Sequence, residues 1–149
     1  MQNWSTKKRV AVLLTLIFGS LIVLGGSITA LVLHLVSTKF TGNLVVDGTV
    51  FNIDKCRSGQ VYNFSGIQLS DDGGRRLRLI QNPTDGIVSV SLFPTDQNRG
   101  VNLGSCGTLS ISSQNSRVNY VMNQSGTATL DCDTDGHKVT GSVAFNNCH

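Results

Sequence analysis

Residues 10–36 read VAVLLTLIFGSLIVLGGSITALVLHLV, and this stretch decides how the rest of the chain is organised. Its 27 residues include no Asp, Glu, Lys or Arg. As a helix the stretch would be about 40 Å long, enough to cross a hydrocarbon layer ~30 Å thick. We therefore expect one transmembrane helix at 10–36.

The charges that flank the apolar stretch predict its orientation. Lys7, Lys8 and Arg9 directly precede it, whereas only Lys39 follows closely. The positive-inside rule then leaves a cytoplasmic stub at 1–9 and places the C-terminal part in the periplasm or outside the cell, anchored in the inner or plasma membrane and its lipid. A cleaved signal peptide is the alternative, but the apolar run is longer than a usual h-region, which favours an uncleaved anchor.

Composition separates the exported part from the anchor. All nine acidic residues are Asp and lie beyond residue 36, as do nine of the twelve basic residues. The exported part is therefore close to neutral, and the net charge of +3 comes from the basic cluster before the apolar stretch. This balance argues against nucleic-acid binding.

After a linker at 37–48, the chain alternates apolar and polar residues over short segments, which is typical of β-strands. Turn sequences such as Asp47-Gly48 and Asp135-Gly136 separate these segments. We expect a mainly β exported domain at 49–149, an antiparallel β-sandwich or small barrel. The expected strands are 49–53, 61–67, 77–80, 87–93, 107–111, 127–132 and 139–145, with 112–125 as a long connection or short helix.

Four cysteines, all exported and without a C-x-x-C spacing, predict two disulfides that staple this domain. If 107–111 pairs antiparallel with 127–130, Cys106 and Cys132 meet at one end of the two strands. Cys56 and Cys148 then remain for the second bond. We favour this pairing among the three that are possible.

Two polar motifs are candidate binding sites. Asp131, Asp133 and Asp135 alternate before Gly136, like the opening of a Ca²⁺ loop, but Ser142 stands where an EF-hand loop has Glu. We therefore favour a solvated Asp-Gly hairpin over a Ca²⁺ site. The cluster of Arg75, Arg76 and Arg78 would place its last two members on one face of a strand, where they could meet anionic headgroups, an acidic partner or only solvent.

Catalytic motifs are missing from the sequence. It contains no G-x-S-x-G, no H-E-x-x-H and no phosphate-binding G-x-x-x-x-G-K-[ST], and the exported histidines are His137 and the C-terminal His149. We therefore expect that the protein is not an enzyme and needs no cofactor for catalysis.

Small residues in the apolar stretch predict helix packing. Gly19, Gly26, Ala30 and His34 project from one side of the expected helix, and Gly26-x-x-x-Ala30 would let a neighbouring helix approach closely. The run from Gly26 to Leu35, with Trp4 and the basic cluster, resembles the α-polypeptides of bacterial light-harvesting antennae. That resemblance implies a bacteriochlorophyll bound through His34, with Ala30 making room for the macrocycle.

The exported part is similar to uncharacterised small exported bacterial domains that contain disulfides. Three segments carry this resemblance: Cys56–Gly59, Gly73–Leu79 and Gly141–His149. It implies a disulfide-bonded β-domain and brings no activity with it.

Together these features predict a non-catalytic single-pass membrane protein. Its exported β-domain would act as an accessory or structural subunit, or as a binding module, of a larger membrane complex, with contacts to other subunits through both the helix and the domain. An antenna-like subunit binding bacteriochlorophyll through His34 and a Ca²⁺-dependent anchored binding protein are the alternatives.

Overall fold

A nearly closed, barrel-like antiparallel sheet forms the described part of the chain in the computed structural model, which covers residues 37–95, 97–118 and 120–149. Thr38–His149 make one compact unit. The stub at 1–9 and the expected transmembrane helix at 10–36, including Gly19, Gly26, Ala30 and His34, lie outside the described residues. Within the described part, no helix has the length and hydropathy needed to span a membrane.

Strands dominate the described residues, with one short 3₁₀ helix between the third and the fourth. The elements are β1 (Lys39–Val46), β2 (Thr49–Phe51), β3 (Ile53–Ser58), η1 (Gly59–Tyr62), β4 (Gly66–Asp71), β5 (Arg76–Gln81), β6 (Val88–Phe93), β7 (Val101–Val118), β8 (Val121–Thr134) and β9 (His137–Cys148).

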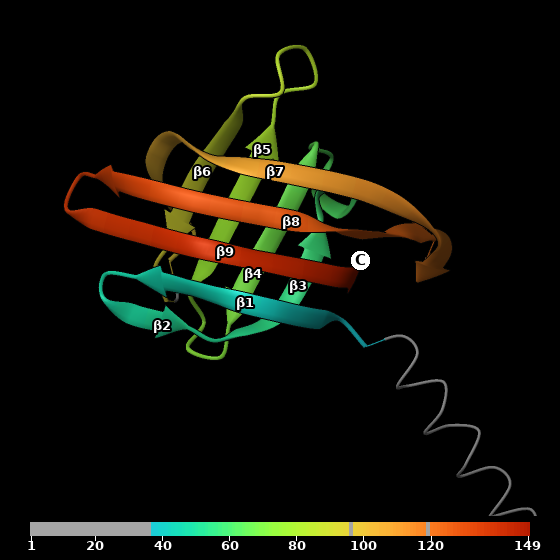
Figure 1. The fold of residues 1–149 in the computed structure, drawn as a ribbon, viewed down its shortest axis with the longest axis horizontal. Coiled ribbons are helices and arrows are strands. Elements are labelled where there is room, and N and C mark those ends of the chain that lie inside the picture. Colours follow the sequence, from blue (N-terminus) through green and yellow to red (C-terminus); the bar gives the residue numbers. More distant parts are fainter. Residues whose placement is uncertain (1–36, 96, 119) are drawn as a thin grey trace, which may run out of the picture. The chain divides into compact units, whose positions relative to one another are not determined.

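The strands lie in the sheet order β2-β1-β9-β8-β7-β6-β5-β4-β3. Figure 1 shows that β1, β9, β8 and β7 cross in front of β3 to β6, so the sheet folds over to make two layers. The long β7 belongs to both, because its first part pairs with β6 and the remainder with β8. Register shifts opposite Val90 mark the bend, where Gly104 adopts a φ of +84° that glycine tolerates best.

Alternation along the strands fills the space between the layers. Inward-facing residues of β4, β5 and β6 pack against those of β1, β7, β8 and β9, which is the period-2 pattern expected for a sheet with one buried face. The largest fully buried side chains are Leu44, Val46, Phe51, Ile67, Leu69, Leu77, Leu79, Val90, Leu103, Leu130, Val139 and Val143.

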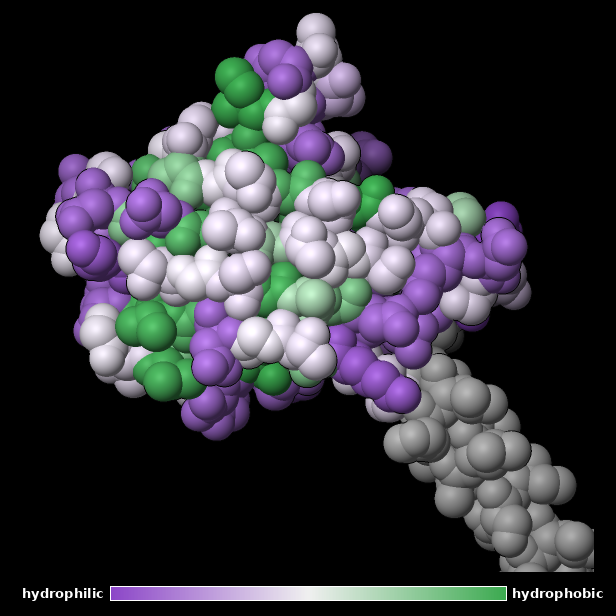
Figure 2. Space-filling model, in the orientation of Figure 1, coloured by the Kyte–Doolittle hydropathy of each residue, from purple (hydrophilic) through white to green (hydrophobic). Residues whose placement is uncertain are grey.

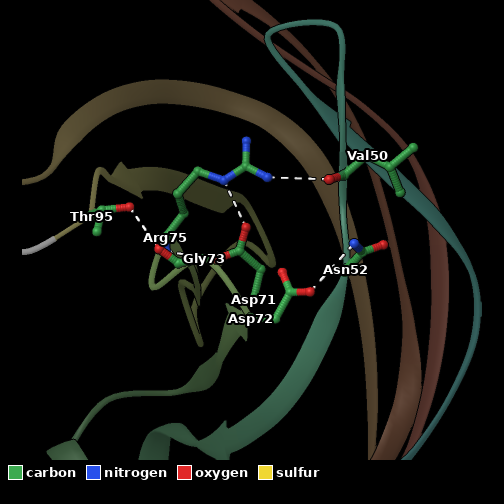
Figure 3. Close-up of polar contacts among 7 residues, drawn as sticks. All are labelled: Val50, Asn52, Asp71, Asp72, Gly73, Arg75 and Thr95. Carbon is green, nitrogen blue, oxygen red and sulfur yellow. Dashed lines mark hydrogen bonds and ion pairs between the residues drawn. The ribbon is translucent and has the colours of Figure 1, made fainter.

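The two edges of the sheet are neighbours in the sequence. Asn52 alone separates β2, at one edge, from β3, at the other, so it is the corner at which the chain passes between the layers. The turn between β4 and β5 is bonded to this corner. Arg75 donates to the carbonyl of Val50 at 3.2 Å, and Nδ2 of Asn52 donates to the Asp72 carboxylate at 3.5 Å (Figure 3). The Asp72 N–H also donates to the carbonyl of Asn52 at 3.2 Å.

Arg75 reaches the corner because a buried carboxylate holds it. The side chain of Asp71 is 1 % exposed and accepts hydrogen bonds of 2.7 Å from both the backbone N–H and the Nε of Arg75. The Arg75 guanidinium also lies over the ring of Phe51, with 5.4 Å between Cζ and the ring centroid. These contacts give the buried carboxylate the hydrogen-bond partners that burial of a polar group requires.

Both disulfides have the pairing that the strand register favoured. Cys106 on β7 is bonded to Cys132 on the adjacent β8, with 5.0 Å between Cα atoms. Cys56 on β3 is bonded to Cys148 at the end of β9, also with 5.0 Å between Cα atoms, which joins the two layers covalently. The predicted antiparallel pairing of 107–111 with 127–130 is confirmed, and it extends to Gly126 opposite Ile111.

The linker predicted at 37–48 is wrong, because most of it is strand. β1 pairs with β9 along its whole length, from Lys39 opposite Asn146 to Val46 opposite Val139. Only Leu44 and Val46 of β1 are fully buried, so its first half lacks the apolar alternation by which a strand is recognised.

The secondary structure expected at 112–125 and at 61–67 also differs from the structure. The segment 112–125 was expected as a long connection or a short helix, but residues 112–118 and 120–125 form the distal part of the hairpin of β7 and β8. The side chains at 112–117 are largely exposed, and they are polar on both faces. The strand expected at 61–67 begins only at Gly66, because η1 and a left-handed Asn63 precede it.

The turns predicted at Asp47-Gly48 and Asp135-Gly136 are present. The φ angles are 52° and 76° for Asp47 and Gly48, and 54° and 78° for Asp135 and Gly136. They join β1 to β2 and β8 to β9. The Asp47 carboxylate lies 2.8 Å from Nδ1 of His137 and accepts the Lys138 N–H at 2.8 Å, so the first turn is bonded to the second hairpin.

These bonds change the pKa of Asp47. Partial burial raises the pKa of this carboxyl, but the hydrogen bonds from His137 and Lys138 and the nearby positive charges outweigh burial and lower it below 3.8. A lowered folded-state pKa contributes stability above the unfolded value of about 3.9, and this contribution is lost as the pH falls through the folded pKa.

Replacing Arg75 by Met should destabilise the fold by about 2–3 kcal/mol, because Asp71 would remain buried without its cation. Arg75 itself is only 24 % exposed, so solvent screens the pair little. Urea unfolding of the full chain measures the change, with the exposed Arg99→Met as the matched control. Equal stability of the two variants would show that the corner does not depend on this pair.

Asp47→Asn should lower the free energy of unfolding at pH 6 by no more than about 1 kcal/mol, since the side chain is 42 % exposed. Asn tolerates the left-handed turn conformation, so the turn is kept while the charge and one of the two acceptor oxygens are lost. The difference from the unmodified chain should disappear near pH 2. Asp135→Asn, at the equivalent position of the other turn, is the control, and the same pH dependence in both variants would contradict the assignment.

Candidate functional site: a basic and aromatic sheet face

The outward side of β3, β4 and β5 gathers cations into one surface. Lys55 and Arg57 alternate on β3, and Arg76 and Arg78 alternate on β5, so each pair lies on one side of its strand. The register aligns Arg57, Gln68 and Arg78 in one row across the strands, and Lys55, Ser70 and Arg76 in the next. We call the surface formed by Lys55, Arg57, Arg76 and Arg78 the basic face.

Arg78 is held at the centre of the basic face by aromatic rings and an amide. Its Cζ lies 4.8 Å from the ring centroid of Phe93, 5.5 Å from that of Phe64 and 5.7 Å from that of Tyr62. Its Nε and Nη2 donate to Oε1 of the buried Gln68 at 3.3 and 3.0 Å. Contacts of this kind fix the plane of a guanidinium while leaving its charge uncompensated.

Arg57 and Arg76 flank this centre and are also held by neutral groups. Arg57 donates to the hydroxyl of Tyr62 at 2.6 Å, and Arg76 lies 5.2 Å from the centroid of Phe93 and donates to the carbonyl of Gln97. Among the described residues, no carboxylate forms an ion pair with Arg57, Arg76 or Arg78. Three arginines therefore present positive charge that the described part of the chain does not neutralise.

A concavity of about 310 Å³ lies on this face. Its lining includes Lys55, Arg57, Tyr62, Gln68, Ser70 and Arg76. Asp71 also borders it, but that carboxylate is already bonded to Arg75. Planar guanidinium groups around a hollow suit bidentate hydrogen bonds to carboxylate or phosphate oxygens.

The outward side of the other layer has a different character. Thr108, Thr129, Ser142 and Asn43 lie in one exposed row across β7, β8, β9 and β1. Thr129 and Ser142 hydroxyls lie 3.1 Å apart. Figure 2 shows this face as a broad area of intermediate hydropathy, without a concentration of charge at its centre. The basic face therefore belongs to the layer formed by β3 to β6.

Of the three predicted arginines, Arg76 and Arg78 share the basic face, as expected for a strand, whereas Arg75 belongs to the corner of the sheet. Sequence reasoning missed Lys55, Arg57 and the aromatic residues beneath the guanidinium groups. The spacing Lys55-x-Arg57 was a usable signal, since it matches Arg76-x-Arg78.

The structure does not gather the predicted Ca²⁺ ligands. Asp131 and Asp133 lie on β8 and Asp135 in the turn that follows, and Asp133 pairs with Lys138 at 3.4 Å. In the described ranges, no group of three or more His, Cys, Asp or Glu residues is arranged to hold a metal ion. Extended backbone separates alternate residues by about 7 Å, which keeps these carboxylates apart.

Comparison with protein-family models, with curated proteins and with solved structures finds no match to this chain. The geometry of the basic face is therefore the main basis for a functional proposal.

The basic face should contribute little to folding. Arg57→Ser with Arg76→Ser should change the free energy of unfolding by less than about 1 kcal/mol, because the groups lost are exposed or half-buried and have no buried ionic partner. Urea unfolding of the full chain checks this. A loss above about 2 kcal/mol would mean that these arginines hold the sheet together rather than await a ligand.

Proposed function

We propose that this protein is a membrane-anchored, non-catalytic binding module whose β-domain docks through the basic face onto an acidic surface of a partner protein in the same membrane complex. The observation that carries the proposal is the set of three arginines on one sheet face, without carboxylate partners among the described residues. Arg76 and Arg78 stack on aromatic rings, and Arg57 is held by the hydroxyl of Tyr62. The apolar stretch at 10–36 would supply the anchor.

The way the arginines are held favours protein carboxylates as the ligand. Arg and Tyr are enriched among the residues that dominate binding energy at protein interfaces. Aromatic stacking orders Arg78 and Arg76 before binding, so less side-chain entropy is lost when the partner docks.

Strand geometry sets the spacing that a partner must match. Arg76 and Arg78 are alternate residues, about 7 Å apart along β5, while Arg57 and Arg78 lie two strands apart, at about 10 Å. Acidic side chains spaced by one or two turns of a helix, or alternating along a strand, meet these distances. The partner surface should therefore be an ordered element rich in Asp or Glu.

The test measures binding of the full chain, in a neutral detergent, to a fluorescent oligoglutamate peptide by anisotropy. Arg57→Ser, Arg76→Ser and Arg78→Ser together should weaken binding at least tenfold, and binding should fall as salt rises. Lys39→Ser, Arg99→Ser and Arg117→Ser together remove the same charge from exposed positions outside the face and serve as the control.

A second arm separates carboxylates from lipid. Changing the three arginines to lysine keeps the charge but removes the planar fork, so binding to the peptide should weaken while any binding to vesicles with 30 mol% phosphatidylglycerol should not. Binding to vesicles alone would overturn the acidic-protein assignment. Equal peptide binding by the serine variant and its control would reject the basic face as a docking surface.

A further inference from the structure

A second hollow, of about 780 Å³, lies where the loop from β3 to β4 faces the hairpin of β7 and β8. In Figure 1 this loop, with η1, lies behind β7 and β8 at the end of the sheet. Gln60, Asn63, Ser65, Gln81 and Gln124 supply its polar wall, and Phe64 its aromatic wall. None of the residues that line it is charged, which separates it in chemistry from the basic face.

Local backbone chemistry holds the loop in place. The Ser58 hydroxyl accepts the Gln60 N–H at the start of η1, and Asn63 ends η1 in the left-handed region at a φ of 61°. The Phe64 N–H then donates to the carbonyl of Gly59 at 3.0 Å. The wall formed by 63–65 is therefore built before any ligand arrives, as expected of a binding pocket.

Gly66 fixes where the loop returns to the sheet. Its φ is +147°, and a Cβ at this position would collide with the carbonyl oxygen of Leu79 on β5. The backbone thus approaches β5 more closely than another residue would allow, and this approach brings Ser65 towards Gln81. Gln81 in turn donates from Nε2 to the carbonyl of Leu109 at 3.2 Å, which leaves its Oε1 to accept from a ligand.

Gln124 borders the hollow from β8, and its side chain is only 7 % exposed. Its Oε1 is buried and has no hydrogen-bond partner among the described residues. A buried amide oxygen without a partner costs free energy of the order of 1–3 kcal/mol. Rotation of this side chain toward the hollow would let the oxygen accept a hydrogen bond from a bound molecule and recover this cost.

Phe64 completes the hollow with a ring of fixed orientation. It stacks on Tyr62, with centroids 6.3 Å apart and ring planes 12° from parallel, and Arg78 lies near it on the side of the basic face. A ring held in this way presents an apolar surface with a negative face, which suits the polarised C–H groups of a sugar ring.

We propose that this hollow is a binding site for one or two units of a neutral saccharide. Each of the four amide side chains offers both donors and acceptors, which matches sugar hydroxyls, since these also do both. The absence of charge from the lining disfavours ionic ligands, and Phe64 beside the amides supplies the apolar contact. The inference does not depend on the basic face, because none of its four cations lines this hollow.

The experiment is saturation-transfer difference NMR on the full chain, in a detergent without sugar headgroups. The probes are the neutral tetrasaccharides of β-1,4-linked N-acetylglucosamine, β-1,4-linked glucose and α-1,4-linked glucose. At least one should receive saturation at millimolar concentration. Gln124→Leu, which keeps the volume and removes the amide, should reduce its affinity at least fivefold.

Matched variants keep the result interpretable. Gln114→Leu removes another amide whose Oε1 lacks a partner among the described residues, but Gln114 does not line the hollow, so affinity should stay unchanged. Gln60 lies on the exposed loop, so Gln60→Ala should weaken saccharide binding without affecting folding. This variant tests the site even if Gln124→Leu does not fold. Lys55→Ser with Arg76→Ser should leave saccharide binding intact, which separates this site from the basic face.

Three results would overturn the proposal. One is no transfer to any of the tetrasaccharides from the unmodified chain. Another is equal affinity in Gln124→Leu, Gln60→Ala and Gln114→Leu. The third is transfer to tetraglycine but to none of the sugars, which would assign the hollow to peptide amides instead.

Discussion

The ion pair between Asp71 and Arg75 is the interaction on which the closure of the sheet depends. Without this pair, the turn between β4 and β5 would have no long side chain reaching β2, and the corner at Asn52 would lose its bond to the Val50 carbonyl. Unpaired sheet edges are a liability, since they can pair with other chains. Here β2 and β3, the two edges, are consecutive in the sequence and are tied at the corner between them.

Closure divides the surface of the domain into regions of different chemistry. Because the sheet folds over at β7, it has two outer surfaces. One carries the outward-facing side chains of β3 to β6, and the other carries the outward-facing side chains of β1, β8 and β9. The first layer carries the basic face and the second a neutral face rich in hydroxyl groups. The bond between Cys56 and Cys148 holds the two layers together near the end where the loop containing η1 builds the neutral hollow.

Phe64 links the two proposed binding regions. One of its neighbours is Arg78, the centre of the basic face, while its own ring lines the hollow. A ligand that reorients this ring would therefore also change the support of the central guanidinium. Tyr62, which stacks on Phe64 and accepts a hydrogen bond from Arg57, extends the same connection to the edge of the sheet.

The sequence by itself determined the class of the domain, because alternation and turn chemistry are local properties. The Asp-Gly turns, the antiparallel pairing of 107–111 and the preferred disulfides all follow from spacing within one or two strands. Prediction failed where local signals were weak. β1 has few buried residues, and residues 112–117 of the hairpin are polar on both faces. Both segments are strands because their backbones are hydrogen-bonded to a neighbouring strand.

Only the tertiary structure decided the candidate sites. Arg57 and Arg78 are far apart in the sequence but share a row because β4 pairs with both β3 and β5. Gln124 meets Asn63 and Gln81 only because the sheet folds over at β7. The predicted Ca²⁺ ligands show the converse, since neighbours in sequence are held apart by an extended backbone. A site needs side chains to converge in space, and in an antiparallel sheet that convergence is set by register and curvature rather than by sequence distance.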